Sequence, residues 1–259
     1  TRRLPLSNRR DELDMLAAIV NAMLERIERL MNEVKGVCDN IAHDLRTPLT
    51  RLRAQLYRIQ QQADDGSPLA AQLDSVLGEA DTLMARFRGL LRISELEDRQ
   101  RRSGFVQLDP LPMLQEVHDF YLPLAEEGEL TFRLQLPAAL PPLNGDRALL
   151  FEALANLLSN SIKFTPPGGE VILRGIDAGG HTRIEVLDSG PGIALAEREA
   201  VFRRFYRAEG GNQQSGFGLG LSIVAAIVSL HGFTLEVGES ELGGARLVLE
   251  CRQNLIAQS

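Results

Sequence analysis

His43 has the neighbours that a nucleophilic histidine needs. It lies two residues after Ile41, a member of an apolar helical seam, so at about 100° per residue its side chain lies off that seam. The carboxylate of Asp44 can accept a hydrogen bond from one ring nitrogen, which leaves the other nitrogen free to attack. Thr47 lies one helical turn on, and Pro48 permits a kink beside the histidine. Two non-catalytic interpretations of His43 compete with this one. It is not a core residue, because it lies off the apolar seam; an ordinary solvated surface position is left open but does not account for these neighbours.

A second chemical set lies on the helical pattern at residues 146–161. Asn156 and Asn160 are four residues apart and therefore share one helix face, with Lys163 next to it. Amide oxygens can coordinate Mg²⁺, and a lysine pairs with phosphate, so this face suits a metal with a polyphosphate. The alternative is an ordinary polar stripe on a solvated helix.

Two glycine-rich segments complete the candidates. Asp188 opens the run DSGPGI after a strand-like segment, where it is either an ordinary turn residue or an acceptor for the amino group of adenine. The run GFGLGLS at 216–222 opens a helical pattern that extends from Leu219 to His231. A glycine loop that leads into a helix N-terminus is an anion site, because its unpaired N–H groups point at phosphate.

The first hundred residues have the composition and periodicity of helices. Apolar residues at alternating steps of three and four form a heptad seam, and three consecutive steps of four, from Val37 through Ile41 to Leu49, form a stutter. A turn cluster at 64–68 separates this seam from a second one, which predicts a helical hairpin with one long arm. Two helices cannot bury such wide seams alone, so we expect a dimer that forms a four-helix bundle. The seams comprise Leu13, Leu16, Val20, Met23, Ile27, Leu30, Val34, Val37, Ile41, Leu45, Leu49, Leu52, Leu56 and Ile59, then Leu69, Leu73, Val76, Ala80, Leu83, Phe87 and Leu90.

From about Arg101 the composition and the hydrophobic patterns of the chain are typical of an α/β sandwich. Prolines and glycines multiply, and short strand-like runs at 171–174 and 183–186 alternate with helical patterns at 146–161 and 219–231. The fold class predicted is therefore α plus α/β, with the helical hairpin followed by the sandwich.

Composition excludes several classes of function. The formal net charge of -7 and the absence of tryptophan argue against nucleic-acid binding. Cys38 and Cys251 are too far apart for a metal motif or a disulfide framework. The densest apolar run, at 221–230, is about half the ~20 residues that a spanning helix needs, so we expect the chain as given to be soluble. It begins with Thr1 and no signal peptide, as an excised fragment would.

The motifs resemble those of sensor histidine kinases. HDLRTPL at 43–49 is similar to the phosphoacceptor box, the helix at 149–164 to the N box, and DSGPGI to the first glycine box. FRRFYR at 202–207 resembles the F box and the 216–222 run resembles the second glycine box, with residues 209–215 as an ATP lid. Residues 10–30 resemble the second helix of a HAMP domain. Five motifs in family order exclude chance.

This resemblance implies a function and its residues. The chain would use Mg²⁺ and ATP to phosphorylate His43, then pass the phosphoryl group to an aspartate of a response regulator and also dephosphorylate that regulator. Asp44 and Thr47 would assist His43, and Asn160 would hold the metal. The implied ATP-binding residues are Asn156, Asn160, Lys163, Phe164, Asp188, Gly190, Gly192, Ile193, Tyr206, Arg207, Gly216, Gly218, Leu219, Gly220 and Leu221.

The resemblance also implies an organisation. Residues 1–34 would be the C-terminal helix of a HAMP-like relay, 35–100 the dimerisation and histidine phosphotransfer domain, and 101–259 the catalytic ATP-binding domain. The chain would be the cytoplasmic part of a homodimeric bacterial inner-membrane protein, anchored by segments that it lacks.

Three positions depart from the family pattern. Asp44 replaces the more frequent glutamate, and Phe164 stands where tyrosine is usual. Ala245 follows the last glycines, where threonine is common, so no ligand contact is expected there.

Two other functions compete with the kinase. Hydrolases of the same fold place a glutamate base four residues before the metal-binding asparagine, but here that position is Asn156, and Glu152 is one turn out of register. A coiled-coil scaffold with a degenerate nucleotide domain is the non-enzymatic alternative, although the motif residues are all present.

Overall fold

The computed structural model describes residues 15–16, 19–26, 48, 50–51, 54–59, 68–96, 104–206 and 218–252. The chain divides into two compact units, Thr1–Ser94 and Glu95–Ser259. Among the described helices, none is long and apolar enough to cross a membrane.

The described residues of the first unit are helical. Residues 15–16, 19–26, 48, 50–51 and 54–59 all have helical backbone, and α2 (Pro68–Leu96) begins at the expected second seam. Pro68 stands at the first helical position, where its missing N–H costs nothing. The second helix of the predicted hairpin is confirmed, whereas residues 64–67 of the turn cluster lie outside the described residues.

Several apolar seam residues of this unit are exposed to solvent in the single chain. Leu73 is buried, but seam residues on both predicted arms are exposed by about half of their surface. Exposed apolar side chains at heptad spacing need a partner to cover them. These residues, with their exposed fractions, are Leu16 (57%), Met23 (62%), Ile59 (48%), Val76 (46%) and Leu83 (52%).

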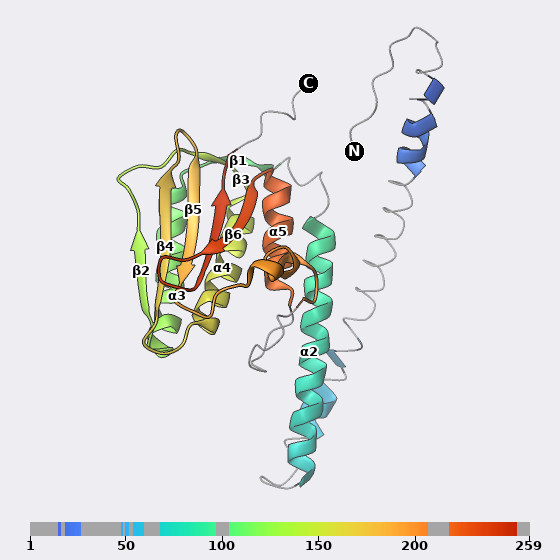
Figure 1. The fold of residues 1–259 in the computed structure, drawn as a ribbon. Helices are drawn as coiled ribbons and strands as arrows, with labels where there is room; N and C mark the ends of the chain where they lie inside the picture. The colour runs from blue at the N-terminus through green and yellow to red at the C-terminus, as the bar shows by residue number, and fades with distance from the viewer. Residues whose placement is uncertain are drawn as a thin grey trace. The chain divides into compact units, whose positions relative to one another are not determined.

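The second unit is a five-stranded mixed sheet covered on one side by three helices (Figure 1). The strand order is β2-β4-β5-β7-β6, with β2 parallel to β4 and the other neighbours antiparallel, and β1 pairs separately with β3. The strands are β1 (Val106–Leu108), β2 (Thr131–Gln135), β3 (Leu143–Gly145), β4 (Glu170–Asp177), β5 (Thr182–Asp188), β6 (Thr234–Glu239) and β7 (Ala245–Glu250). The helices are α3 (Pro110–Glu127), α4 (Arg147–Phe164) and α5 (Gly220–His231), with short 3-10 turns η2 (Leu195–Glu197) and η3 (Ala200–Phe202).

The expected α/β sandwich, its two strand runs and its two helices are therefore confirmed. Asp146 caps α4 by accepting hydrogen bonds from the N–H groups of Ala148 and Leu149, and Gly232 ends α5 in a left-handed conformation (φ 73°). The helix α3 has no counterpart among the sequence expectations. Its Pro110 occupies the first turn, where proline is compatible with a helix, and Asp109 caps it.

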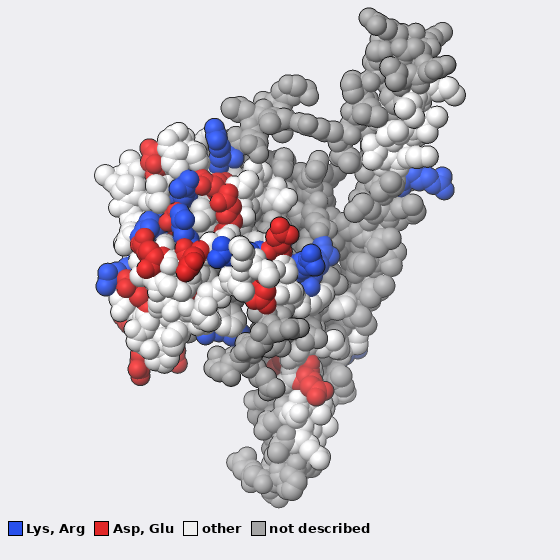
Figure 2. Space-filling view, viewed as in Figure 1, with Lys and Arg blue, Asp and Glu red and all other residues white. Residues whose placement is uncertain are grey.

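The main core lies between the helices and the side of the sheet that they cover. It is built from alternate strand residues and one face of each helix, as the periods of two and 3.6 require. Core members include Leu114 and Val117 of α3, Leu154 and Leu158 of α4, Ile227 of α5, and Val171, Leu173, Ile184, Val186 and Leu249 of the sheet. The opposite side of the sheet carries paired charges, and Figure 2 shows acidic and basic side chains interspersed over this unit.

Candidate functional site

Asp188 is the most constrained polar residue of the candidate site. It ends β5 and is only 5% exposed. One carboxylate oxygen, Oδ1, accepts hydrogen bonds from the backbone N–H groups of Gly190 (3.0 Å) and Ala245 (2.9 Å). The other, Oδ2, accepts from the hydroxyl of Ser161 on α4 (3.1 Å), which is itself buried. Three segments of the chain thus fix the carboxylate in one orientation.

Glycine is required where the backbone approaches Asp188. A Cβ on Gly244 would lie 2.3 Å from Asp188 Oδ1 and 2.4 Å from its backbone oxygen, closer than real Cβ atoms come. Gly192 has φ 73° and faces the backbone of Gly244, so the loop after β5 and the start of β7 run close together. Next to Gly192, the carbonyl of Ile193 accepts a hydrogen bond from Arg198 Nε (3.3 Å).

The N-terminus of α5 lies against the asparagine face of α4. A Cβ on Gly220 would be 3.2 Å from Asn156 Oδ1 and 3.5 Å from Asn160 Nδ2. The Nδ2 of Asn156 donates to the carbonyl of Glu152 (2.9 Å), which holds that side chain along the helix. Leu219 precedes the helix and gives it no side-chain cap. The first N–H groups of a helix have no partner within it, so this helix start is a candidate anion site beside Asn160.

A backbone clasp joins the F-box segment to the second glycine segment. The N–H of Phe205 donates to the carbonyl of Gly218 (2.9 Å), and a Cβ on Gly218, whose φ is 65°, would lie 2.5 Å from the carbonyl oxygen of Tyr206. The hydroxyl of Tyr206 donates to Glu197 Oε1 (2.9 Å). The clasp brings together the two ends of the 207–217 segment, which contains the predicted lid and lies outside the described residues.

Lys163 and Phe164 end α4 on the same side of the unit as the loop after β5. The Lys163 ammonium lies 5.0 Å from the centroid of the Phe164 ring, within cation–π range. The carbonyl of Phe164 would lie 3.1 Å from a Cβ on Gly190, so this helix end borders the first glycine box. Phe164 is half exposed, so its ring is open to a ligand or a partner.

The donor set fits a magnesium ion only together with a polyphosphate. Among the described residues, no group of three histidine, cysteine or acidic side chains is arranged to hold a metal ion. Mg²⁺ usually takes one or two protein oxygens, several waters and substrate phosphates, so one asparagine oxygen beside an anion-binding helix start is sufficient.

The structure brings most predicted nucleotide residues to one end of the second unit. Leu219 is buried and Leu221 is half-buried at the start of α5, beside the asparagines of α4, while the glycines after β5 lie against Phe164 and Gly244. The predicted residues His43, Asp44, Thr47, Arg207 and Gly216 lie outside the described residues.

Ser161, Gly244 and Ala245 belong to the site although their types gave no signal in the sequence. Because residue 245 lacks the hydroxyl of the more common threonine, the sequence predicts no ligand contact there. Its backbone N–H nevertheless holds Asp188.

Two family models match parts of the chain. Residues 145–254 match the histidine kinase-, DNA gyrase B- and HSP90-like ATPase, and residues 1–29 match the HAMP domain. The first of these spans α4, the glycine loops and β4 to β7.

The relatives are sensor kinases. The chain is 30% identical over 236 residues to the sensor protein IrlS of Burkholderia pseudomallei, covering 90% of this chain and 50% of the relative. It is 33% identical over 238 residues to the signal transduction histidine-protein kinase/phosphatase MprB of Mycobacterium ulcerans, covering 90% and 46%. The chain therefore spans about half the length of these relatives.

Solved structures of histidine kinases share the fold. Full-length ShkA in complex with AMPPNP aligns with a TM-score of 0.64 and 26% identity, over 82% of this chain and 44% of that one. The Acinetobacter baumannii histidine kinase AdeS aligns with a TM-score of 0.58 and 22% identity, over 82% and 98%, which supports the fold alone.

Proposed function

The chain belongs to the sensor histidine kinases, and from this premise we propose that it is an ATP-dependent protein-histidine kinase of two-component signalling. The observation that carries the proposal is the start of α5, which has no side-chain cap and lies beside Asn156 Oδ1 and the side-chain amide of Asn160. An anion site next to an amide oxygen is what Mg²⁺·ATP requires. The ATPase-domain match and the AMPPNP bound to ShkA support ATP as the substrate.

The candidate ATP-binding residues would contact different parts of the nucleotide. Asp188 would accept a hydrogen bond from the adenine amino group, and the N–H groups at the start of α5 would bind the phosphates. Asn160 would hold Mg²⁺, which supplies neutralisation of phosphate charge when bound. Lys163 and Arg207 would pair with phosphate oxygens. None of these roles requires a base to activate water, in line with kinase rather than hydrolase chemistry.

The phosphoryl step would use His43 as the nucleophile. Its free imidazole nitrogen forms a bond to the γ-phosphorus while the bond from that phosphorus to the departing ADP oxygen breaks. Asp44 accepts a hydrogen bond from the other ring nitrogen and stabilises the positive charge that develops on the ring. The phosphoryl group would then pass to an aspartate of a response regulator.

We also propose the family's organisation for this chain. Residues 1–34 would relay a signal, 35–100 would form the dimerisation and phosphotransfer domain, and 101–259 would bind ATP. The exposed seam residues support a homodimer, because a second copy would cover them. The HAMP match supports a cytoplasmic position next to a membrane anchor in the whole protein.

Incubation of the chain with γ-labelled ATP and Mg²⁺ tests this function. A kinase retains the label on the protein, a hydrolase releases it as inorganic phosphate, and a scaffold does neither. Retention that requires Mg²⁺ is the expected result. Release without any labelled protein would replace the proposal with the hydrolase alternative.

Thr47 is proposed to orient water for dephosphorylation of the regulator. It lies four residues after His43, so its hydroxyl would stand beside the imidazole on one helix. Thr47→Ala should reduce loss of phosphate from purified phospho-regulator, measured with ADP present, by about tenfold or more. Autophosphorylation needs no such water and should persist. Equal dephosphorylation rates would contradict the role, and loss of both reactions would indicate a structural defect instead.

A further inference from the structure

Ser161 has a contact that the proposed function does not use. It is 2% exposed, and its hydroxyl donates to Asp188 Oδ2 across 3.1 Å, from α4 to the end of β5. We propose that Ser161 is a positioning and specificity-determining residue, whose hydroxyl holds Asp188 so that the site selects purines with a 6-amino group over those with a 6-oxo group. This inference rests on the proposed ATP site.

The hydrogen bonds divide unequally between the two oxygens of Asp188. Oδ1 accepts from two backbone N–H groups, those of Gly190 and Ala245, and these donors belong to no side chain. Oδ2 receives a side-chain donor from Ser161. Rotation of the carboxylate would break contacts to three segments at once. The two backbone bonds alone still allow Oδ2 to tilt about Oδ1, so the orientation of Oδ2 depends on one hydroxyl.

The start of β7 does not supply a second hydroxyl. Residue 245 is alanine, and its contribution to Asp188 is the N–H of its backbone. Ser161 therefore provides the side-chain hydroxyl from the opposite side, on the helix that also carries Asn156 and Asn160. Because these residues are on one helix, the purine end and the phosphate end of the site are linked through α4.

The chemistry of a fixed carboxylate gives the selectivity. Ionised carboxylate oxygens accept hydrogen bonds and cannot donate them. A 6-amino group donates to such an oxygen, whereas a 6-oxo group would place two acceptors against each other and leave the oxo group without a donor in a buried site. A carboxylate that is free to tilt would lose part of its attraction for the amino group and part of its repulsion of the oxo group.

The experiment compares Mg·ADP and Mg·GDP binding to the full chain by calorimetry, for wild type, Ser161→Ala and Ser161→Cys. Loss of the hydroxyl should weaken the affinity for ADP by about tenfold and leave the affinity for GDP unchanged or slightly higher. The ratio of the ADP affinity to the GDP affinity should therefore fall by about tenfold. The cysteine variant keeps the side-chain volume while replacing a strong donor with a weak one, so it should fall in the same direction. In autophosphorylation, KM for ATP should rise while kcat stays within about twofold.

Thr165→Val is the matched control. Its hydroxyl is also buried on this helix end and donates to the carbonyl of Ser161 (2.7 Å), but it does not contact Asp188. The control should leave the ADP/GDP ratio unchanged. An unchanged ratio in both Ser161 variants, or an equal loss for both nucleotides, would overturn the inference. Failure of the wild type to bind either nucleotide would instead overturn the proposed function, and the inference with it.

Discussion

At the scale of the residue, the site consists of oxygen atoms whose directions are fixed by their neighbours. Asp188 is held by three donors, and Asn156 is held by the carbonyl of Glu152. Fixed acceptors lose little freedom when a ligand binds, which favours affinity. Removal of such an atom should therefore lower the affinity for the nucleotide more than it lowers the stability of the fold.

Asn160→Ala should abolish most Mg²⁺-dependent ATP binding. The substitution removes the amide oxygen proposed to hold the metal, at a partly buried position outside the hydrophobic core cluster. We expect ATP affinity in Mg²⁺ to fall by about tenfold or more, and affinity in EDTA to change little. Calorimetry with and without Mg²⁺ measures both values. An equal affinity for wild type and variant in Mg²⁺ would remove Asn160 from the metal site.

Cys251 should make the chain less stable at alkaline pH. Burial, with a smaller contribution from the charge of Glu250, raises the pKa of its thiol from 9.0 to about 12. Because the folded-state pKa is the higher one, its stabilisation is complete below pH 9 and is lost as the pH rises toward 12. At a pH of about 10.5 the loss should be about 2 kcal/mol.

Urea unfolding of wild type and Cys251→Ala measures this effect. The wild type should lose more stability than the variant between pH 8 and pH 10.5, although alanine itself leaves a small cavity at both values. Parallel losses in the two proteins would show that the thiol ionises as easily in the folded chain as in the unfolded one.

Residue types in the sequence predicted one part of this site and not another. Asn156 and Asn160 share one face of α4 and Asp188 ends β5, so their residue types and spacing in the sequence were informative. Ser161 and Ala245 are common residues whose contribution arises from the register of β5 with β7 and the packing of α4. Such contacts depend on segments 27 and 57 residues apart in sequence. Spacing along the chain does not encode them.

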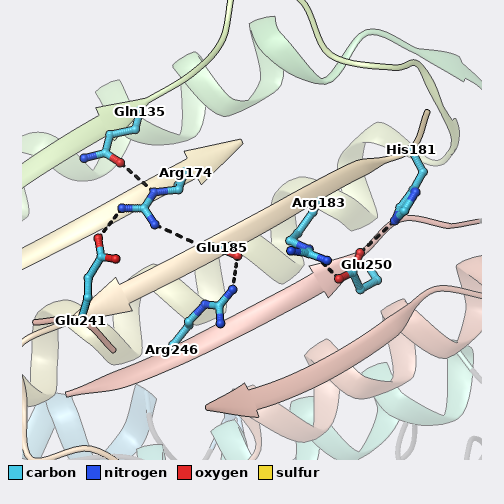
Figure 3. Close-up of polar contacts among 8 residues, drawn as sticks. All are labelled: Gln135, Arg174, His181, Arg183, Glu185, Glu241, Arg246 and Glu250. Carbon is cyan, nitrogen blue, oxygen red and sulfur yellow. Dashed lines mark hydrogen bonds and ion pairs between the residues drawn. The ribbon is translucent and has the colours of Figure 1, made fainter. Parts of the chain in front are cut away.

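At the scale of the element, the side of the sheet opposite the helices carries an ion network centred on one buried glutamate (Figure 3). Glu185 of β5 has a side chain only 1% exposed and pairs with Arg174 on β4 (3.5 Å) and Arg246 on β7. The hydrogen bond with Glu185 raises the pKa of Arg246. Gln135 and Glu241 extend this network through Arg174. A second, separate set on the same sheet pairs Glu250 with His181 and Arg183.

Apolar residues lie in the same layer as these charges. Ile172, Leu187 and Val248 are nearly fully buried, and their register places them on the same side of the sheet as Glu185. The aliphatic stems of neighbouring arginines can cover such residues while their charged ends are held by carboxylates. The network therefore substitutes for a second layer of helices.

Glu185→Ala should destabilise the second unit by about 3 kcal/mol, because it leaves two arginines without their buried partner. Thermal unfolding and chemical denaturation of the full chain measure the loss. Glu241→Gln is the control, since Glu241 pairs with the same Arg174 but has a side chain 59% exposed. The control should leave the melting temperature almost unchanged. Similar small effects for both variants would contradict a structural role for the network.

Elements with a clear period were predictable, and those without one were not. The helices α4 and α5 and the strands β4 and β5 follow from apolar spacing and capping residues. The helix α3 was hidden by Pro110, Pro112 and Pro123. Two of these stand in its first turn, where proline is compatible with a helix. The number of prolines in this segment therefore argued against a helix, although their positions do not.

At the scale of the whole molecule, the account requires one histidine to differ from the others. The chain has four histidines, and three of them lie among the described residues. His231 is buried, with ring nitrogens engaged by the carbonyl of Ile227 and the N–H of Asp146. His118 and His181 each have a ring nitrogen paired with a carboxylate, that of Asp119 and of Glu250. His43 is the remaining histidine, and the motif assigns the reaction to it.

The direct measurement is the site of phosphorylation after incubation with γ-labelled ATP and Mg²⁺. Wild type and His181→Gln should both acquire label that is labile in acid and stable in alkali, as expected for a phosphohistidine. His43→Gln should acquire none while binding ATP with wild-type affinity, which separates loss of the acceptor from loss of the nucleotide site. The account predicts a single labelled peptide that contains His43. Undiminished acid-labile label on His43→Gln would contradict it.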